Sequence, residues 1–473
     1  MDWRILRAIA LGLLAIKLVL LGAIRPFMDE TYYFLWGQHL ALSYFDHPPL
    51  IGWTQWVAGS LFGWTVFGLR AVVALTLLGD LVLLWLFARR LAGDGWRETF
   101  WPLAVVFLAS PIFFALSSVA LPDHLLVLFS LATLYAVESF RQSVEAGAPR
   151  WRWLYLGALA IGLATLSKYT GALLGVALLA YLVAVPSLRR SFRSPHLCLA
   201  GFLAIALQTP VIVWNLQHRF ASFGFIFGGR AALRDLSSLV GLGGFVLGAV
   251  VLLSPVLVIP IGRFLLARRD GHGFARLVFW LSTVGFLAAS LVTNILIHWN
   301  VIAYLAVLPF LAPYLRSRLL LGAQIVYGAL AIAVATVNYT ALPVLALVGP
   351  GDQTSAWSYG WDEVAAAVVD VKATMPVDFV AATDYALASP LAFELRDPNV
   401  TSLSRRHDAY DDWFDPAAHK GQTALIVADR WRPLSTTLSA RFGSVEKVKT
   451  VTITRYGRRI DVHTLYIGRD FSP

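Results

Sequence analysis

The feature that most constrains the fold of this chain is its series of long apolar runs. Runs of about 20 apolar residues recur from the N-terminus to about residue 347, and a helix of that length crosses a hydrocarbon core about 30 Å thick. Of the 473 residues, 58% are hydrophobic and 14% are charged, whereas soluble domains contain about 25% charged residues. A single soluble core cannot accommodate this pattern. The sequence therefore predicts a polytopic α-helical membrane protein.

We predict eleven membrane spans. The first, residues 8–24, follows Arg4 and Arg7 and resembles a signal peptide, but no small-x-small cleavage site follows it, so we expect a retained helix. The other expected spans are 66–88, 99–119, 124–140, 153–167, 170–186, 196–214, 238–261, 274–295, 300–315 and 319–347.

The positive charge of the chain fits membrane topology better than nucleic-acid binding. The formal net charge is +10, but the basic residues form short clusters in alternate connections between apolar runs. Such loops are cytoplasmic in most membrane proteins. We therefore expect a cytoplasmic N-terminus, and no nucleic acid as partner. The clusters are Arg89 and Arg90; Arg141, Arg150 and Arg152; Arg189, Arg190 and Arg193; Arg263, Arg268 and Arg269; and Arg316 and Arg318.

The opposite connections carry the side chains with potential chemistry. Charged groups near hydrocarbon are costly and usually face a cavity, a partner or a substrate. Since these residues all fall on the predicted outer side, we expect them to contribute to one outer site. They are Asp29, Glu30, Asp46, His47, Asp123, Lys168, His218 and His298.

The first outer loop, about residues 25–65, is rich in Tyr, Phe and Trp, which favour the membrane interface. Apolar positions recur at helical spacing from Glu30 to Leu42, and Asp29 stands where an N-cap belongs. We therefore expect a short amphipathic helix that lies on the membrane surface and begins at Asp29.

The character of the chain changes after about Leu347. Gly349-Pro350-Gly351 ends the last expected span, and charged residues become frequent over 349–473. We divide the chain into a membrane domain, 1–348, and a soluble α/β domain, 349–473, which an odd number of spans would place outside. Its expected strands are 378–382, 400–403, 424–428, 448–454 and 460–467, the last two forming a hairpin around Arg455-Tyr456-Gly457-Arg458.

Several motifs, taken in order, resemble those of the GT-C glycosyltransferases. They are Asp29-Glu30 after the first span, Tyr44-Phe45-Asp46-His47-Pro48-Pro49-Leu50, Leu121-Pro122-Asp123, Leu166-Ser167-Lys168-Tyr169, the stretch 210–215 with His218, and His298-Trp299-Asn300. The chain is most similar to bacterial members related to protein mannosyltransferases and to the aminoarabinose transferase of lipid A, ArnT. The resemblance covers the membrane part and, more loosely, the tail.

The resemblance implies inverting transfer of a sugar from a polyprenyl-phosphate carrier to an acceptor on the outer face of a bacterial inner membrane. Asp29 is then the candidate base for the acceptor hydroxyl, with Glu30 binding the acceptor or orienting the loop. Lys168 is the candidate cation for the lipid phosphate. The structural alternatives stay open: an N-cap for Asp29, a helix-dipole partner for Glu30 and a snorkelling lysine for Lys168.

Other candidate substrate-binding residues are Asp46, His47, Asp123 and His298. A glutamate and a lysine tend to occupy the positions of Asp46 and His47 in the aminoarabinose-transferase relatives, so the sugar and the acceptor stay open: lipid A, another envelope glycan or a protein. Basic residues Arg455, Arg458 and Arg459 would suit an anionic acceptor. The sequence requires no cofactor; Asp46 and His298 are the candidate ligands should a divalent metal bind.

Two rival classes remain at this stage. A transporter or lipid flippase would also have many spans and intramembrane charges, but transporters often have paired halves with broken helices, and we find no such repeat. If the protein were a noncatalytic envelope scaffold, there would be no common functional reason for the outer acids and Lys168. Asp80 and Lys17 could form a structural bridge between two spans.

Overall fold

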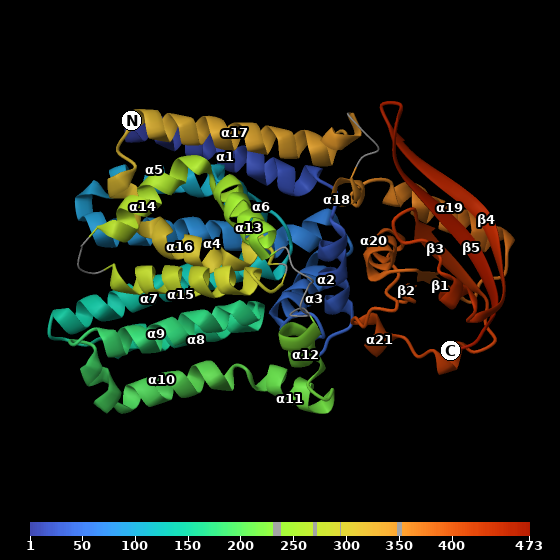
Figure 1. Cartoon of the computed structure of the whole chain (residues 1–473), viewed down its shortest axis with the longest axis horizontal. Helices are drawn as coiled ribbons and strands as arrows, with labels where there is room; N and C mark the ends of the chain where they lie inside the picture. Colours follow the sequence, from blue (N-terminus) through green and yellow to red (C-terminus); the bar gives the residue numbers. More distant parts are fainter. Residues whose placement is uncertain (230–237, 268–271, 294, 348–351) are drawn as a thin grey trace. The chain divides into compact units, whose positions relative to one another are not determined.

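The computed structural model describes residues 1–229, 238–267, 272–293, 295–347 and 352–473. The described chain divides into two compact units (Figure 1). Unit 1 contains Met1–Val19, Leu42–Ile51 and Val72–Ile332, and unit 2 contains Leu20–Ala41, Gly52–Ala71 and Ala333–Pro473. The predicted domain boundary at 348/349 lies in a stretch outside the described residues and stays a prediction.

Helices dominate the chain up to residue 340. The longer ones are α1 (Trp3–Ala23), α2 (Met28–Gln38), α3 (Leu50–Phe62), α4 (Val66–Ala92), α5 (Trp96–Ala109), α7 (Pro122–Glu145), α8 (Trp151–Ser167), α9 (Ala172–Ala184), α10 (Pro195–Ala206), α11 (Thr209–Gln217), α13 (Ser238–Leu253), α14 (Val258–Leu266), α15 (Gly273–Ser290) and α17 (Arg318–Thr340). Shorter pieces are α6 (Pro111–Leu116), α12 (Ala221–Gly224) and α16 (Val301–Val307). Within unit 1, α7 packs against α8, α15 and α16 and is mostly buried.

Five helical stretches of the described chain are long and apolar enough to cross a membrane: 3–23, 66–109, 122–145, 273–290 and 318–340. Two bent pairs raise the number to seven: α10 with α11, at an angle of 44°, and 241–253 with 255–266, at 93°. Two further apolar helices, 169–184 and 297–310, are shorter. The chain is therefore an integral membrane protein, and the count of eleven spans stays a prediction.

Unit 2 contains a five-stranded sheet in the order β2-β1-β3-β5-β4. The strands are β1 (Phe379–Ala382), β2 (Thr401–Ser402), β3 (Ala424–Asp429), β4 (Phe442–Arg455) and β5 (Arg458–Phe471). β1 pairs in parallel with β2 and β3, whereas β5 runs antiparallel to β3 and β4. All five strands expected from the sequence are confirmed, including the hairpin.

The sheet is held by an apolar core and by helices from the same stretch of chain. Phe379, Ala424, Ile426 and Phe471 belong to one buried cluster. Helices α19 (Trp361–Thr374) and α20 (Tyr385–Leu395) contact β4 and β1 respectively. Smaller helices in this part are α18 (Gln353–Ala356), α21 (Tyr410–Trp413) and α22 (Thr436–Ser439).

The hairpin between β4 and β5 turns at Tyr456 and Gly457, whose φ angles are 49° and 74°. Two consecutive positive φ angles define the type I′ turn, whose twist suits a two-residue hairpin. Glycine adopts this conformation without steric cost, which explains why Gly457 can end the turn. The α/β character expected for the tail is therefore present in the structure.

Candidate functional site

The centre of the candidate site in unit 1 is a buried ion pair between Lys168 and Asp123. Asp123 lies in the first turn of α7, which begins at Pro122. Helix α8 ends at Lys168, whose extended backbone turns into the short 3-10 helix η2 (Tyr169–Gly171). The Lys168 Nζ donates to both carboxylate oxygens of Asp123, at 2.8 and 3.0 Å. Both side chains are buried, so the two helix ends hold a paired charge away from bulk solvent.

Two histidines add further charge-bearing groups to this pair. The Asp123 carboxylate interacts electrostatically with His298 and His47 as well as with Lys168. His298 lies on the 3-10 helix η6 (Ile297–Asn300), and His47 lies in the buried loop before α3. Four of the residues predicted from the sequence therefore converge in unit 1. We call Asp123, Lys168, His47 and His298 the Lys168 cluster.

An apolar cavity opens against the Lys168 cluster. Its volume is about 310 Å³, and Lys168 and His47 supply the cationic or polar part of its lining. The rest of the wall is mostly apolar and aromatic. It comes from η2, α15, η6, the segment between α15 and η6, and Ile226, with residues Tyr169, Thr170, Ile226, Phe286, Ala289, Thr293, Ile295 and Trp299. A lysine beside an apolar wall suits an anionic group attached to a hydrocarbon chain, because each part of such a ligand meets a matching surface.

The loop before α3 is fixed by burial and aromatic packing. Asp46 is 3% exposed and His47 is 8% exposed. The Phe45 ring contacts Phe225 at a centroid distance of 4.6 Å. Among the described residues, no group of three or more His, Cys, Asp or Glu side chains could hold a metal ion. Asp46 and His298 therefore have no third ligand of these types within that part of the chain.

Asp29 and Glu30 belong to unit 2, on helix α2. The helix exists as expected, but its start was predicted wrongly. Phe27 is the N-cap, and Asp29 is the second helical residue. Glu30 caps the helix instead, because the Phe27 N–H donates to its carboxylate at 3.0 Å. The N-cap reading of Asp29 is therefore excluded.

The expected amphipathic character of this helix is also wrong, whereas its position on the membrane surface stays a prediction. Residues 30–37 are all buried, so α2 has no polar face turned to solvent. The helix packs against α20 of the same unit. The Tyr32 hydroxyl accepts a hydrogen bond from the Ala409 N–H at 2.9 Å. Helix α2 is thus a buried element, because its aromatic residues pack on all sides rather than along one stripe.

Glu30 makes a buried bidentate ion pair with Arg70, and the sequence reasoning missed this arginine. Arg70 Nη2 and Nε donate to the Glu30 carboxylate at 2.6 and 2.8 Å. Arg70 Nη1 also donates to the carbonyls of Leu21 and Ile24. An arginine within an otherwise apolar run was the available signal, since such a residue needs an acidic or carbonyl partner.

Asp29 has a different environment. Its side chain is only partly buried, and the Tyr385 hydroxyl donates to its carboxylate at 3.5 Å. Tyr385 begins α20, and no sequence motif connected it with Asp29. A partly accessible carboxylate with a long hydrogen bond can accept a proton from a substrate hydroxyl.

The remaining candidates have other partners. Lys17 donates to the Phe114 carbonyl at 2.6 Å and to Ser117 Oγ at 2.7 Å, and its charge acts on the buried Asp80. Among the described residues no ion pair joins Lys17 and Asp80, and both Asp80 carboxylate oxygens are buried without a hydrogen-bond partner, so the bridge between them stays a prediction. The His218 ring stacks on Trp214 at 4.0 Å. Arg455, in the basic hairpin, pairs with Glu363 at 2.7 Å, which reduces its free charge.

Comparison with known proteins identifies the fold. The family model of dolichyl-phosphate-mannose-protein mannosyltransferases matches residues 46–214, which include His47, Asp123 and Lys168. The structure of ArnT from Cupriavidus metallidurans bound to undecaprenyl phosphate is similar over 98% of this chain and 97% of that one, with a TM-score of 0.63 at 18% identity. Its apo structure gives a TM-score of 0.62. The fold is therefore that of the GT-C glycosyltransferases, as the motifs predicted.

One curated relative extends the comparison at the sequence level. The lipid A galacturonosyltransferase RgtD of Rhizobium johnstonii is 30% identical over 217 residues. The match covers 44% of this chain and 43% of the relative, so the chain spans less than half the length of that protein.

Proposed function

We propose that the chain is an inverting glycosyltransferase that takes a sugar from a polyprenyl-phosphate carrier. The observation that carries the proposal is the Lys168 cluster against an apolar cavity. A polyprenyl phosphate has the same two parts, an anionic head and a hydrocarbon chain. The match to a structure of ArnT bound to undecaprenyl phosphate and the similarity to a lipid A galacturonosyltransferase support this donor class.

Lys168 and His47 have the role of binding the donor phosphate. As the acceptor oxygen attacks the anomeric carbon, the bond between that carbon and the phosphate oxygen breaks, and both its electrons pass to the phosphate. A cation held in place before the reaction stabilises this developing charge without reorganisation. Asp123 positions Lys168 through the two hydrogen bonds described above.

Asp29 has the role of the base that removes the proton of the acceptor hydroxyl. This assignment rests on the motif resemblance and on the accessible carboxylate, and Glu30 holds α2 in place through Arg70. Asp46 and His298 complete the set as candidate sugar-binding groups. The acceptor is an envelope lipid or glycan, with lipid A the first choice because the relative RgtD is a lipid A galacturonosyltransferase.

The proposed location is a bacterial inner membrane. With eleven spans and a cytoplasmic N-terminus, the connections that carry Asp29, Asp123 and Lys168 lie on the periplasmic side, and so does the tail 349–473. The basic loops between them lie in the cytoplasm.

The test is sugar transfer by the full-length protein in lipid vesicles. Labelled polyprenyl-phosphate sugars and an envelope extract are supplied to wild type, to Asp29→Asn and to Asp370→Asn, whose exposed carboxylate pairs with Lys449. Transfer by wild type and Asp370→Asn, with a loss of at least about a hundredfold in Asp29→Asn, is the expected result. Equal transfer by all three proteins would remove Asp29 as the base, and absence of transfer with every donor would contradict the proposed activity.

A further inference from the structure

A second cavity lies in unit 1, at the ends of α8, α9 and α10, and the transfer reaction does not use it. Its volume is about 540 Å³, and two arginines and three serines line it beside apolar residues. It is formed by the loop before α8 and by the connection between α9 and α10, which contains the 3-10 helix η3 (Arg189–Arg193). The lining residues that matter here are Trp151, Ser187, Arg190, Ser191, Arg193 and Ser194.

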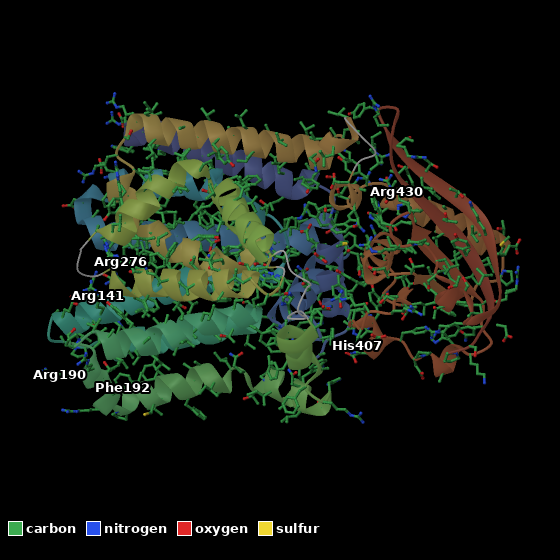
Figure 2. The ribbon with its side chains drawn as sticks, in the orientation of Figure 1. Arg141, Arg190, Phe192, Arg276, His407 and Arg430 are labelled. Atoms are coloured by element: carbon green, nitrogen blue, oxygen red, sulfur yellow. The ribbon has the colours of Figure 1, made fainter. Side chains whose placement is uncertain are left out.

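The two arginines of this cavity are exposed and unneutralised. Within the described residues, neither Arg190 nor Arg193 has an ion pair or a side-chain hydrogen bond, whereas the nearby Arg141 is paired with Glu138 and Glu145. Phe192, between them, is 47% exposed. Figure 2 shows Arg190, Phe192 and Arg141 at the same end of the unit 1 helices. Cationic groups beside an exposed aromatic ring are typical of a surface that contacts lipid headgroups.

An apolar groove of about 380 Å³ begins one helical turn away from this cavity. It runs between α8, α9 and α10, and its first lining residues, Leu154 and Leu197, lie three positions after Trp151 and Ser194. Three residues of helix correspond to about 4.5 Å along the axis. A pocket that contains two arginines is therefore followed directly by a slot for hydrocarbon.

Three polar aromatic side chains lie near the lining residues of both cavities on α8 and α10. The His196 ring stacks on Trp151 at 4.8 Å, and its Nδ1 shares a hydrogen bond of 2.9 Å with the Tyr155 hydroxyl. Aromatic rings with one polar edge concentrate at the level of lipid headgroups. These three rings indicate that the headgroups of the bilayer lie at the level between the two cavities.

We propose that this pocket and groove bind one anionic glycerophospholipid of the surrounding bilayer. The phosphate lies at Arg190 and Arg193, and an acyl chain follows the groove between α8 and α10. The charge of the pocket favours an anionic lipid. Guanidinium groups bind phosphate well, whereas the ammonium group of a zwitterionic lipid would be repelled by the two arginines. The site lies in a connection that the sequence places on the cytoplasmic side, where anionic lipids attract basic segments. The proposal is independent of the proposed transfer activity.

The first test measures lipid binding to the full-length protein by native mass spectrometry in detergent. Phosphatidylglycerol, phosphatidylcholine and undecaprenyl phosphate are titrated against wild type, Arg190→Gln/Arg193→Gln and the control Arg316→Gln/Arg318→Gln, which removes the same charge from another exposed loop. Wild type and control should prefer phosphatidylglycerol to phosphatidylcholine. The pocket variant should bind phosphatidylglycerol about twenty-five-fold more weakly, about fivefold for each arginine. Equal binding of both phospholipids by wild type, or equal phosphatidylglycerol binding by both variants, would overturn the proposal.

The second test fills the groove without touching the arginines. A Cβ at Gly201, which lines the groove, would meet no atom within 4 Å, so Gly201→Leu places its side chain in the slot without a clash. Gly322→Leu, on α17, is the matched control because its Cβ is equally open. Gly201→Leu should lower phosphatidylglycerol retention several-fold at an unchanged melting temperature. If Gly201→Leu retained as much phosphatidylglycerol as Gly322→Leu, the acyl-chain assignment would be overturned. Displacement of phosphatidylglycerol from this site by equimolar undecaprenyl phosphate would overturn it as well.

Discussion

Lys168 and Glu30 are both buried charged residues, but their surroundings give them different roles. The Glu30 carboxylate is held by Arg70 and by the Phe27 N–H, so its oxygens are used within the protein. Lys168 has Asp123 on one side and the apolar cavity on the other. An ammonium group has three donor hydrogens. Lys168 can therefore donate to a ligand while it stays paired with Asp123, whereas the Glu30 carboxylate is already used within the protein.

We predict that Lys168→Met lowers kcat/KM for transfer at least about a hundredfold and raises KM for the lipid donor, because the phosphate loses its cation. Breaking a buried ion pair also costs about 3–5 kcal/mol when one charge is left behind. The double variant Lys168→Met/Asp123→Asn removes both charges and should recover stability without activity. Wild-type KM in the double variant, measured by titration with the labelled donor, would contradict the role of Lys168.

We predict that Glu30→Gln mainly lowers stability. The buried Arg70 loses its anionic partner, which should reduce the free energy of unfolding by about 3 kcal/mol. Thermal unfolding in detergent measures this change, with the exposed Glu98→Gln as control. The activity per folded molecule should stay within a few-fold of wild type. Wild-type stability with no activity would instead make Glu30 a catalytic residue.

Sequence alone predicted the members of the Lys168 cluster but not the partners of the acids in unit 2. Asp123, Lys168, His47 and His298 occur in motifs with a recognisable order, and span topology placed them on one side. Arg70 and Tyr385 lie in no such motif. Their roles depend on which side chains meet after folding, and no spacing along the chain encodes that.

At the scale of elements, the turn between α8 and α9 positions Lys168. Gly171 ends η2, and a Cβ there would lie 2.3 Å from the Ala164 backbone carbon. The close approach allows η2 to pack against the last turn of α8, immediately after Lys168. Only glycine permits this contact.

We predict that Gly171→Ala lowers donor affinity at least about tenfold, because η2 must move away from α8 and Lys168 moves with it. Gly175→Ala, one turn later, is the control: its Cβ would meet Ile161 at 3.4 Å, an ordinary contact with a side chain. Binding of labelled polyprenyl phosphate to the purified proteins measures the effect. Equal affinities in the two variants would show that the turn does not position the lysine.

The sheet of unit 2 provides a prediction on pH. Burial lowers the pKa of His463, on β5, to about 4, whereas a histidine in the unfolded chain titrates near 6.5. The unfolded state therefore binds a proton that the folded state does not, and stability falls as the pH drops through 6.5 toward 4. Asp461, whose pKa burial raises to about 6, contributes in the opposite direction.

Between pH 7 and pH 5 the free energy of unfolding falls in wild type because His463 is buried neutral. We predict that this fall is about 2 kcal/mol smaller in His463→Gln. Because the Asp461 carboxylate lies 3.7 Å from His463 Nε2, both proteins are compared in an Asp461→Asn background, which removes its contribution. Pulse proteolysis of the full-length protein in urea, scored on fragments of 353–473, measures the difference. Parallel pH profiles for the two proteins would contradict a buried neutral histidine.

Local patterns predicted the strands better than the helix geometry. Alternation and the turn residues Tyr456-Gly457 identified the hairpin, because register and turn type are encoded locally. The expected spans 196–214 and 238–261 are each bent instead, and Ser254 has a φ of 117° at the second break. Hydropathy measures only how apolar a run is, so it cannot detect a bend within the run.

At the scale of the whole molecule, the similarity to ArnT extends over nearly the full length of both chains. The sequence match to the lipid A galacturonosyltransferase covers less than half of each protein. The similarity in fold therefore extends over more of the chain than the similarity in sequence. The fold alone does not determine which sugar or which acceptor the protein uses. In our proposal, the Lys168 cluster is the part of the site that binds the lipid-phosphate donor.

The most direct test of the central claim follows both products of the reaction in one assay. A polyprenyl-phosphate sugar, labelled in the sugar and in the phosphate, is supplied in vesicles with and without the envelope acceptor. We predict one released polyprenyl phosphate for each sugar joined to acceptor, inversion at the anomeric carbon, and no release without acceptor. Movement of intact donor across the bilayer without cleavage would contradict the account and identify a transporter.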